Sequence, residues 1–145
     1  MITITRKLWF SAGHRVWGHE NVCSNLHGHN YEVHLTATAR NLDPVGRVVD
    51  FSVLKDLFNN WLNANWDHGF LYYSLDRELS RAFQREELIT MKTYRCPFNP
   101  TAEEMAKHLL DLGPEILSGT EVQLIRVKIF ETPNCWAEAT NEVIS

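Results

Sequence analysis

The chain has 145 residues, of which 44% are hydrophobic and 22% are charged, as expected for a single soluble domain spanning residues 1–145. Its formal net charge of −4 disfavours nucleic-acid binding, which needs a basic face, but is compatible with a local basic pocket for a phosphorylated small molecule. Three widely spaced cysteines, no basic-then-apolar leader and no apolar run of transmembrane length predict a reducing, cytoplasmic location without a membrane partner.

Two long stretches near the start of the chain alternate in polarity, as β-strands do. Residues 2–17 carry His14 on their apolar face, and residues 27–42 carry His27 and His29 together on theirs. The polar segment between the two stretches is expected to form a loop, and a DPVG turn signal follows the second one. We therefore expect two long antiparallel strands.

The middle of the chain predicts one long helix followed by an irregular insert. The apolar residues of SVLKDLFNNWL recur at helical spacing, Ser52 is a plausible N-cap, and the helix should end near Trp66. Residues 72–95 are less regular, and there we expect a short helix beginning near Asp76 and a short strand over LITMKTY.

The last part of the chain predicts a second main helix and two strands. PTAEEMAKHLLDLG has a capping box of Thr101 with Glu104, and Gly113 is placed as its C-terminal cap. EVQLIRVKIFET alternates and places Ile125 and Glu131 on one face, and CWAEATNEV is expected to be the last strand. The resulting element order predicts an α+β fold in which the helices cover one face of an antiparallel sheet.

Histidine is unusually concentrated near the start of the chain, with four of seven between His14 and His29. His27 and His29 project from one strand face about 7 Å apart, and His14 has the register to join them from the first strand. Three neutral imidazoles suit Zn²⁺ and leave a fourth position open, which is the pattern of a catalytic site. The alternative is that the three are ordinary polar residues near a loop.

Four further residues, Cys23, Glu131, Asp67 and His68, have side chains that could take part in chemistry. Cys23 could be a fourth zinc ligand, an activated thiol, or a small buried hydrophobe, although its polar loop argues against the last. Glu131 on an apolar face would pair with a cation or accept N–H groups from a ligand, unless the strand ends earlier and the carboxylate is solvated. The adjacent Asp67 and His68 would form a relay only if they met Cys23 in space. His108, in the middle of a helix, is expected at the surface.

Six segments, in order along nearly the whole chain, resemble the 6-pyruvoyl-tetrahydropterin synthase family. The likeness is greater to its 6-carboxy-tetrahydropterin synthase branch, the queuosine-pathway enzyme, because three residues separate Cys23 from His27 and the interval is longer in the animal pyruvoyl branch. Two features depart from the family pattern: Trp66 stands where leucine is usual, and residues 72–99 are longer than in compact members. The matching segments are FSAGH (10–14), CSNLHGHNYEV (23–33), GRVVDFSVLK (46–55), WDHGFL (66–71), PTAEEMA (100–106) and ET (131–132).

The resemblance implies roles for the candidate residues. Cys23 would be the proton acceptor rather than a metal ligand, and His68, with Asp67 beside it, would be its relay partner. Glu131 would anchor a pterin ring and take part in the relay. The implied zinc ligands are His14, His27 and His29, and a weaker match places Thr101 and Glu103 near the pterin pocket.

The resemblance also implies an assembly and a reaction. The fold would be the tunnelling fold, assembled as a homohexamer of two trimers with active sites between subunits. The reaction would convert 7,8-dihydroneopterin triphosphate to 6-carboxy-5,6,7,8-tetrahydropterin with loss of acetaldehyde and triphosphate. The alternatives are a 6-pyruvoyl-tetrahydropterin synthase and a non-catalytic zinc- or pterin-binding module. Unranked candidates for binding the triphosphate are Arg15, Lys55, Arg126 and Lys128.

Overall fold

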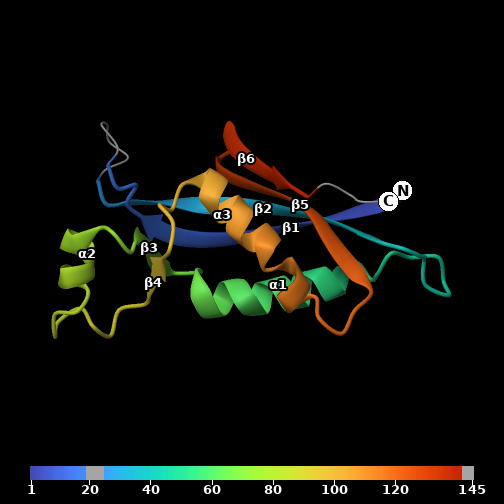
Figure 1. The fold of residues 1–145 in the computed structure, drawn as a ribbon, viewed down its shortest axis with the longest axis horizontal. Helices are drawn as coiled ribbons and strands as arrows, with labels where there is room; N and C mark the ends of the chain where they lie inside the picture. Colours follow the sequence, from blue (N-terminus) through green and yellow to red (C-terminus); the bar gives the residue numbers. More distant parts are fainter. Residues whose placement is uncertain (19–24, 142–145) are drawn as a thin grey trace.

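A single six-stranded sheet forms the framework of this computed structural model, which describes residues 1–18 and 25–141. The strand order is β4-β3-β1-β2-β5-β6, and the helices lie along the sheet (Figure 1). The strands are β1 (Thr3–His14), β2 (His27–Ala39), β3 (Gly69–Tyr73), β4 (Thr93–Cys96), β5 (Val122–Thr132) and β6 (Cys135–Thr140). The helices are α1 (Phe51–Asn65), α2 (Arg77–Ala82), α3 (Ala102–Asp111) and α4 (Gly113–Ile116).

The predicted antiparallel sheet is confirmed for the four strands β1, β2, β5 and β6, whereas β3 and β4 add to the edge of β1 in parallel. The sequence did not predict β3 because GFLYY does not alternate: Leu71 and Tyr72 are both buried, and Phe83 packs on Phe70 and Tyr72. The strand predicted over LITMKTY forms later, at Thr93–Cys96. The short helix predicted near Asp76 is confirmed.

Both main helices pack on the same face of the sheet, as predicted. Apolar side chains of α1 and α3 belong to one buried cluster with those of β1, β2 and β5. Burying such side chains is the main favourable contribution to folding. Trp66, the departure from the family pattern, is fully buried and contacts Phe10 with ring centroids 5.5 Å apart. It therefore belongs to the core rather than to the site.

Three details of the helix ends differ from the prediction. Asp50, not Ser52, caps α1, because its carboxylate accepts the backbone N–H and the hydroxyl of Ser52. Thr101 accepts the N–H of Glu104 at 3.2 Å as predicted, but its own N–H donates to Asn99 at 2.7 Å, so only half of the capping box forms. Gly113 does not cap α3; it begins the short helix α4.

The buried faces of the strands and helices follow the prediction except at a β-bulge in β5 and at His108 of α3. The register between β2 and β5 shifts between Thr36 and Ala37, so Leu124 rather than Ile125 joins the core cluster. His108 is not a surface residue: it is half-buried and lies 3.0 Å from the Tyr94 hydroxyl. Burial lowers the pKa of His108.

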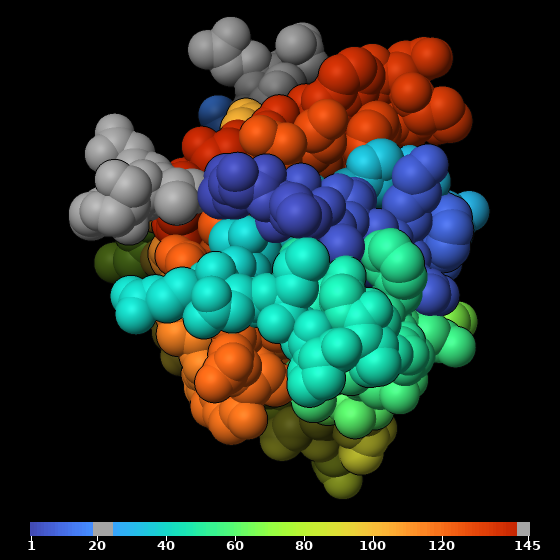
Figure 2. Space-filling view, turned by 90° about the vertical axis from the view of Figure 1, so that its right-hand side faces the viewer, coloured from blue at the N-terminus to red at the C-terminus, as the bar shows by residue number. Residues whose placement is uncertain are grey.

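The start of β1 and the loop of residues 40–50 lie side by side at the end of the molecule shown in Figure 2. They enclose a mainly apolar hollow of about 300 Å³ whose walls include Ile2, Leu42 and Phe51. Within the described part of the chain, no helix is both long and apolar enough to cross a membrane.

Candidate metal centre

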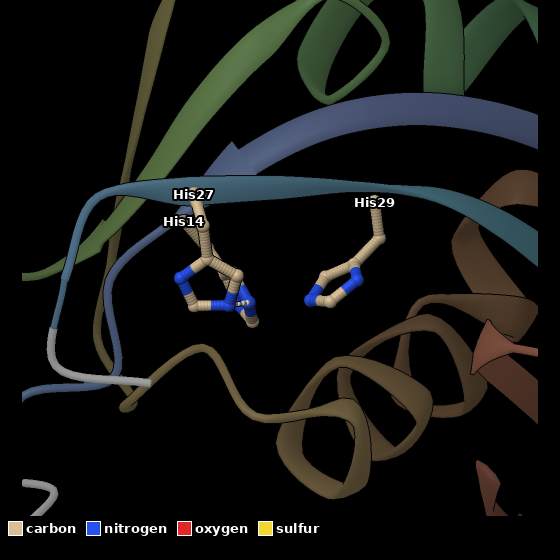
Figure 3. A group of neighbouring side chains, drawn as sticks. All are labelled: His14, His27 and His29. Carbon is tan, nitrogen blue, oxygen red and sulfur yellow. Dashed lines mark hydrogen bonds between the residues drawn. The ribbon is translucent and has the colours of Figure 1, made fainter. Parts of the chain in front are cut away.

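Three histidines project together from the paired ends of β1 and β2 (Figure 3). In the antiparallel register His14 lies opposite His27, and His29 lies opposite the small Ala12. Alternation along each strand then places all three rings on the core face. Their ligand nitrogens lie within 4.8 Å of one another. The predicted grouping of His14, His27 and His29 is therefore present in the structure.

Backbone carbonyls fix the tautomers of two of these rings. The Nδ1 of His14 lies 2.7 Å from the Pro100 carbonyl, and the Nδ1 of His27 lies 2.8 Å from the Asn25 carbonyl. Since a carbonyl oxygen can only accept, both Nδ1 atoms carry the proton. In a neutral ring, Nε2 then presents a lone pair. This carbonyl contact is the usual way in which a protein orients a metal-binding histidine.

The arrangement of the Nε2 atoms calls for a cation. The Nε2 atoms of His14 and His27 are 3.0 Å apart, so two lone pairs would face each other with nothing between them. Burial lowers the pKa of His14 to about 4, so the His14 Nε2 carries no proton at neutral pH. The Nε2 of His29 is also buried and has no hydrogen-bond partner among the described residues. Three neutral imidazoles with converging lone pairs fit a divalent metal such as zinc.

The segment before α3 contains Pro100, whose carbonyl contacts His14, and this segment is itself fixed by hydrogen bonds. Asn99 accepts the N–H of Trp17 at 2.9 Å and donates to its carbonyl at 2.8 Å. This clamp ties the segment containing Pro100 to the chain just beyond His14. Sequence reasoning missed both Asn99 and the Pro100 carbonyl, since a backbone acceptor has no residue-type signature.

Glu131 lies beside the histidines, at the end of β5. Its Oε2 atom is 3.9 Å from the His29 Nε2, and its side chain is 28% exposed. That distance is too long for a hydrogen bond, and the carboxylate accepts none from the described residues. Tyr31, two residues beyond His29, is fully buried, and its hydroxyl also lacks a partner in the described part of the chain. Burial, with a smaller contribution from Glu131, raises the pKa of Tyr31.

The Asp67–His68 pair lies on the opposite face of the sheet. Asp67 accepts the N–H of Ser11 at 3.0 Å and contacts the His68 Nδ1 at 2.9 Å. The His68 ring is 80% exposed and borders a hollow of about 440 Å³ that Ser11, Asn30 and His29 also line; the side chains of Ser11 and Asn30 alternate with those of the three histidines. Among the described residues, His68 forms no hydrogen bond or ion pair with the three histidines.

The remaining predicted residues occupy different surroundings. Cys23 lies outside the described residues. Thr101 is half-buried next to Pro100, whereas Glu103 is exposed. Two of the four candidates for binding the triphosphate already have carboxylate partners: Arg15 pairs with Asp76, and Arg126 pairs with Glu138. Lys55 is exposed and Lys128 is half-buried.

Comparison with known proteins gives consistent matches over nearly the whole chain. Residues 3–142 match the family 6-pyruvoyl tetrahydropterin synthase. The chain is 40% identical to the 6-carboxy-5,6,7,8-tetrahydropterin synthase of Rickettsia bellii, over 95% of this chain and 99% of that one.

Two solved structures show the same fold. An uncharacterized protein from Wolinella succinogenes has a TM-score of 0.80 at 25% identity, covering 97% of this chain and 98% of that one. The 6-pyruvoyl tetrahydropterin synthase of Caenorhabditis elegans has a TM-score of 0.67 at 23% identity, covering 97% and 96%.

Proposed function

Because the chain belongs to the 6-pyruvoyl tetrahydropterin synthase family, we propose that it is a zinc-dependent 6-carboxy-5,6,7,8-tetrahydropterin synthase acting on 7,8-dihydroneopterin triphosphate. Family membership makes it a lyase of the pterin synthase type with the tunnelling fold. The specific reaction, with acetaldehyde and triphosphate as the other products, is supported by the name of the Rickettsia bellii relative. The three-residue interval between Cys23 and His27 supports the same choice and a place in queuosine biosynthesis.

The observation that carries this proposal is the convergence of three histidine ring nitrogens within 4.8 Å of one another. His14, His27 and His29 would hold the zinc ion, with the Pro100 and Asn25 carbonyls keeping two of the rings in the metal-binding tautomer. When bound, zinc would supply Lewis-acid polarisation of oxygens on the substrate side chain, which makes the adjacent C–H bonds more acidic.

Glu131 is proposed to bind the pterin ring. A carboxylate can accept two parallel N–H bonds from the amino-pyrimidine edge of a pterin, as it does from a guanidinium. Glu131 is half-buried, accepts no hydrogen bond from the described residues, and lies next to His29. A ring held there would direct its side chain toward the three histidines. Thr101, beside Pro100, and Glu103, in the first turn of α3, would border the same pocket.

Proton transfer is assigned to Cys23 and to the Asp67–His68 pair. The Cys23 thiolate would accept a proton from the substrate side chain. Asp67 contacts the His68 Nδ1 and so orients that ring. Because the pair lies on the face opposite the metal centre, it would serve a site completed by a neighbouring copy, in keeping with a homohexamer of two trimers.

Product identification tests this function directly. Zinc-loaded protein incubated with 7,8-dihydroneopterin triphosphate should release acetaldehyde and triphosphate. Release of triphosphate without acetaldehyde would instead indicate the 6-pyruvoyl reaction, and no turnover would indicate a non-catalytic binding module.

The variant Cys23→Ala tests the assignment of the base. We expect turnover to be lost while zinc is retained. Wild-type turnover would disprove the role of the thiol, and loss of zinc would identify Cys23 as a fourth ligand of a closed structural site.

A further inference from the structure

A hollow lined entirely by polar side chains lies between α2 and β4, in the insert that departs from the family pattern. Its volume is about 250 Å³, below the range of roughly 300–1,000 Å³ of ordinary small-molecule pockets. That size suits a head group rather than a whole ligand. The lining residues are Ser74, Arg77, Ser80, Arg81, Gln84 and Arg95.

The three arginines of this hollow have no carboxylate partner among the described residues. None of the three, Arg77, Arg81 and Arg95, forms an ion pair or a side-chain hydrogen bond with another described residue. By contrast, Arg15 and Arg126 each pair with a carboxylate. Arg77 and Arg81 are four residues apart on α2, where like charges repel each other. An anion bound between them would remove this repulsion.

A buried hydroxyl adds a second, independent sign of a ligand. Ser80 is one of the residues that line the hollow, and its Oγ atom is buried and has no hydrogen-bond partner within the described residues. A buried polar atom without a partner destabilises the folded protein. Ser80 can donate to a phosphate oxygen, so an anion in the hollow would satisfy it.

We propose that Arg77, Arg81 and Arg95, with Ser80, bind a phosphate group carried by a small molecule. The planar guanidinium fork matches two phosphate oxygens at once, which an ammonium does not. None of these residues is among the four candidates named from the sequence. The insert thus supplies a local basic site in a chain whose formal net charge is −4.

The position of the hollow relates it to the metal centre. Leu71 of β3 pairs with His14, and the next residue, Tyr72, pairs with Arg95. Figure 1 shows α2 at the end of the sheet where β1 ends. The phosphate could belong to the triphosphate tail of the substrate, an assignment that rests on the proposed function, or to a separate small molecule. The shared chemistry is a phosphate group.

Binding of inorganic triphosphate to the zinc-loaded full chain tests the site without relying on activity. Calorimetric titration at about 0.15 M salt should show binding by the wild type. Arg81→Gln and Arg95→Gln should each weaken it about tenfold or more, since each removes a charge-assisted contact. Arg85→Gln is the matched control, because Arg85 is an exposed arginine of the same insert outside the hollow. Thermal unfolding of each variant confirms that it is folded.

The outcomes show whether the phosphate site exists and, if it does, which molecule carries the phosphate. Absence of binding by the wild type, or equal weakening by Arg85→Gln, would overturn the proposal. If binding weakens only in Arg81→Gln and Arg95→Gln and the KM for the pterin triphosphate also rises with kcat unchanged, the phosphate is the tail of the substrate. An unchanged KM with the same loss of triphosphate binding supports the site and assigns it to a separate small molecule. If the proposed pterin synthase reaction is not observed, the titration with inorganic triphosphate still tests the phosphate site.

Discussion

Replacement of Asn99 by alanine should weaken metal binding, although among the described residues the Asn99 side chain forms no hydrogen bond with the three histidines. The change removes two hydrogen bonds, of 2.9 Å and 2.8 Å, that tie Asn99 to the backbone of Trp17. Each is worth about 0.5–1.5 kcal/mol, and the exposed position favours the lower half, so we expect a loss of about 1–2 kcal/mol of stability. Because Asn99 precedes the carbonyl that orients His14, metal affinity should fall about tenfold, as for residues that support ligands.

The assay is competition of zinc between the protein and a chromophoric chelator, combined with urea unfolding of the metal-free protein. Asn65→Ala is the matched control, because Asn65 also donates to a backbone carbonyl, that of Trp61 at 2.9 Å, but at the end of α1. Both variants should lose stability, and only Asn99→Ala should lose metal affinity. Equal metal affinities of Asn99→Ala and wild type would refute the positioning argument.

Three further changes test the site and its supports. His14 has a pKa of about 4 in the folded protein and about 6.5 in the unfolded chain. Its contribution to the free energy of unfolding, roughly 3 kcal/mol, is therefore present above pH 6.5 and is lost as pH falls toward 4. In urea unfolding of the metal-free protein, His14→Gln should show a weaker dependence of stability on pH than the wild type, and an equal dependence would contradict this. Asp76→Asn breaks the buried pair with Arg15 and should cost about 3 kcal/mol, measured by thermal unfolding, whereas a loss below about 1 kcal/mol would place the pair with ordinary surface ion pairs. In Gly28→Ala, the new Cβ would lie 2.9 Å from the Ala12 carbonyl oxygen, so zinc affinity should fall as the strands separate; an unchanged Co²⁺ absorption spectrum would show that they do not.

The cluster of three histidines was predictable because its geometry is local. Period-two alternation places His27 and His29 on one face, and an antiparallel partner of similar length brings His14 opposite. Glu131 was placed on the correct face for the same reason. By contrast, the position of His68 depends on the parallel pairing of β3 with β1. This is a contact between segments distant in the sequence, and the alternation of polarity along a strand does not predict it.

Other features were missed because two physical solutions compete in the sequence. Asp50 and Ser52 are both good helix caps, and only the backbone conformation selects Asp50. His108 falls between apolar helix positions, and its burial depends on Tyr94 and Trp66, which come from elsewhere in the chain. The bulge in β5 needs one extra residue that leaves the hydrophobic pattern nearly intact.

The two strands that carry the histidines are not equally supported, and this sets an order for how the centre comes apart. Residues 12–14 of β1 lie between β2 and β3, whereas the pairing of β2 with β5 begins only at Glu32. Strand segments with one neighbour open more readily than those with two. We therefore expect amide hydrogen exchange to be faster at His29 than at His14, and metal release to begin with the departure of His27 and His29 while His14 stays in place.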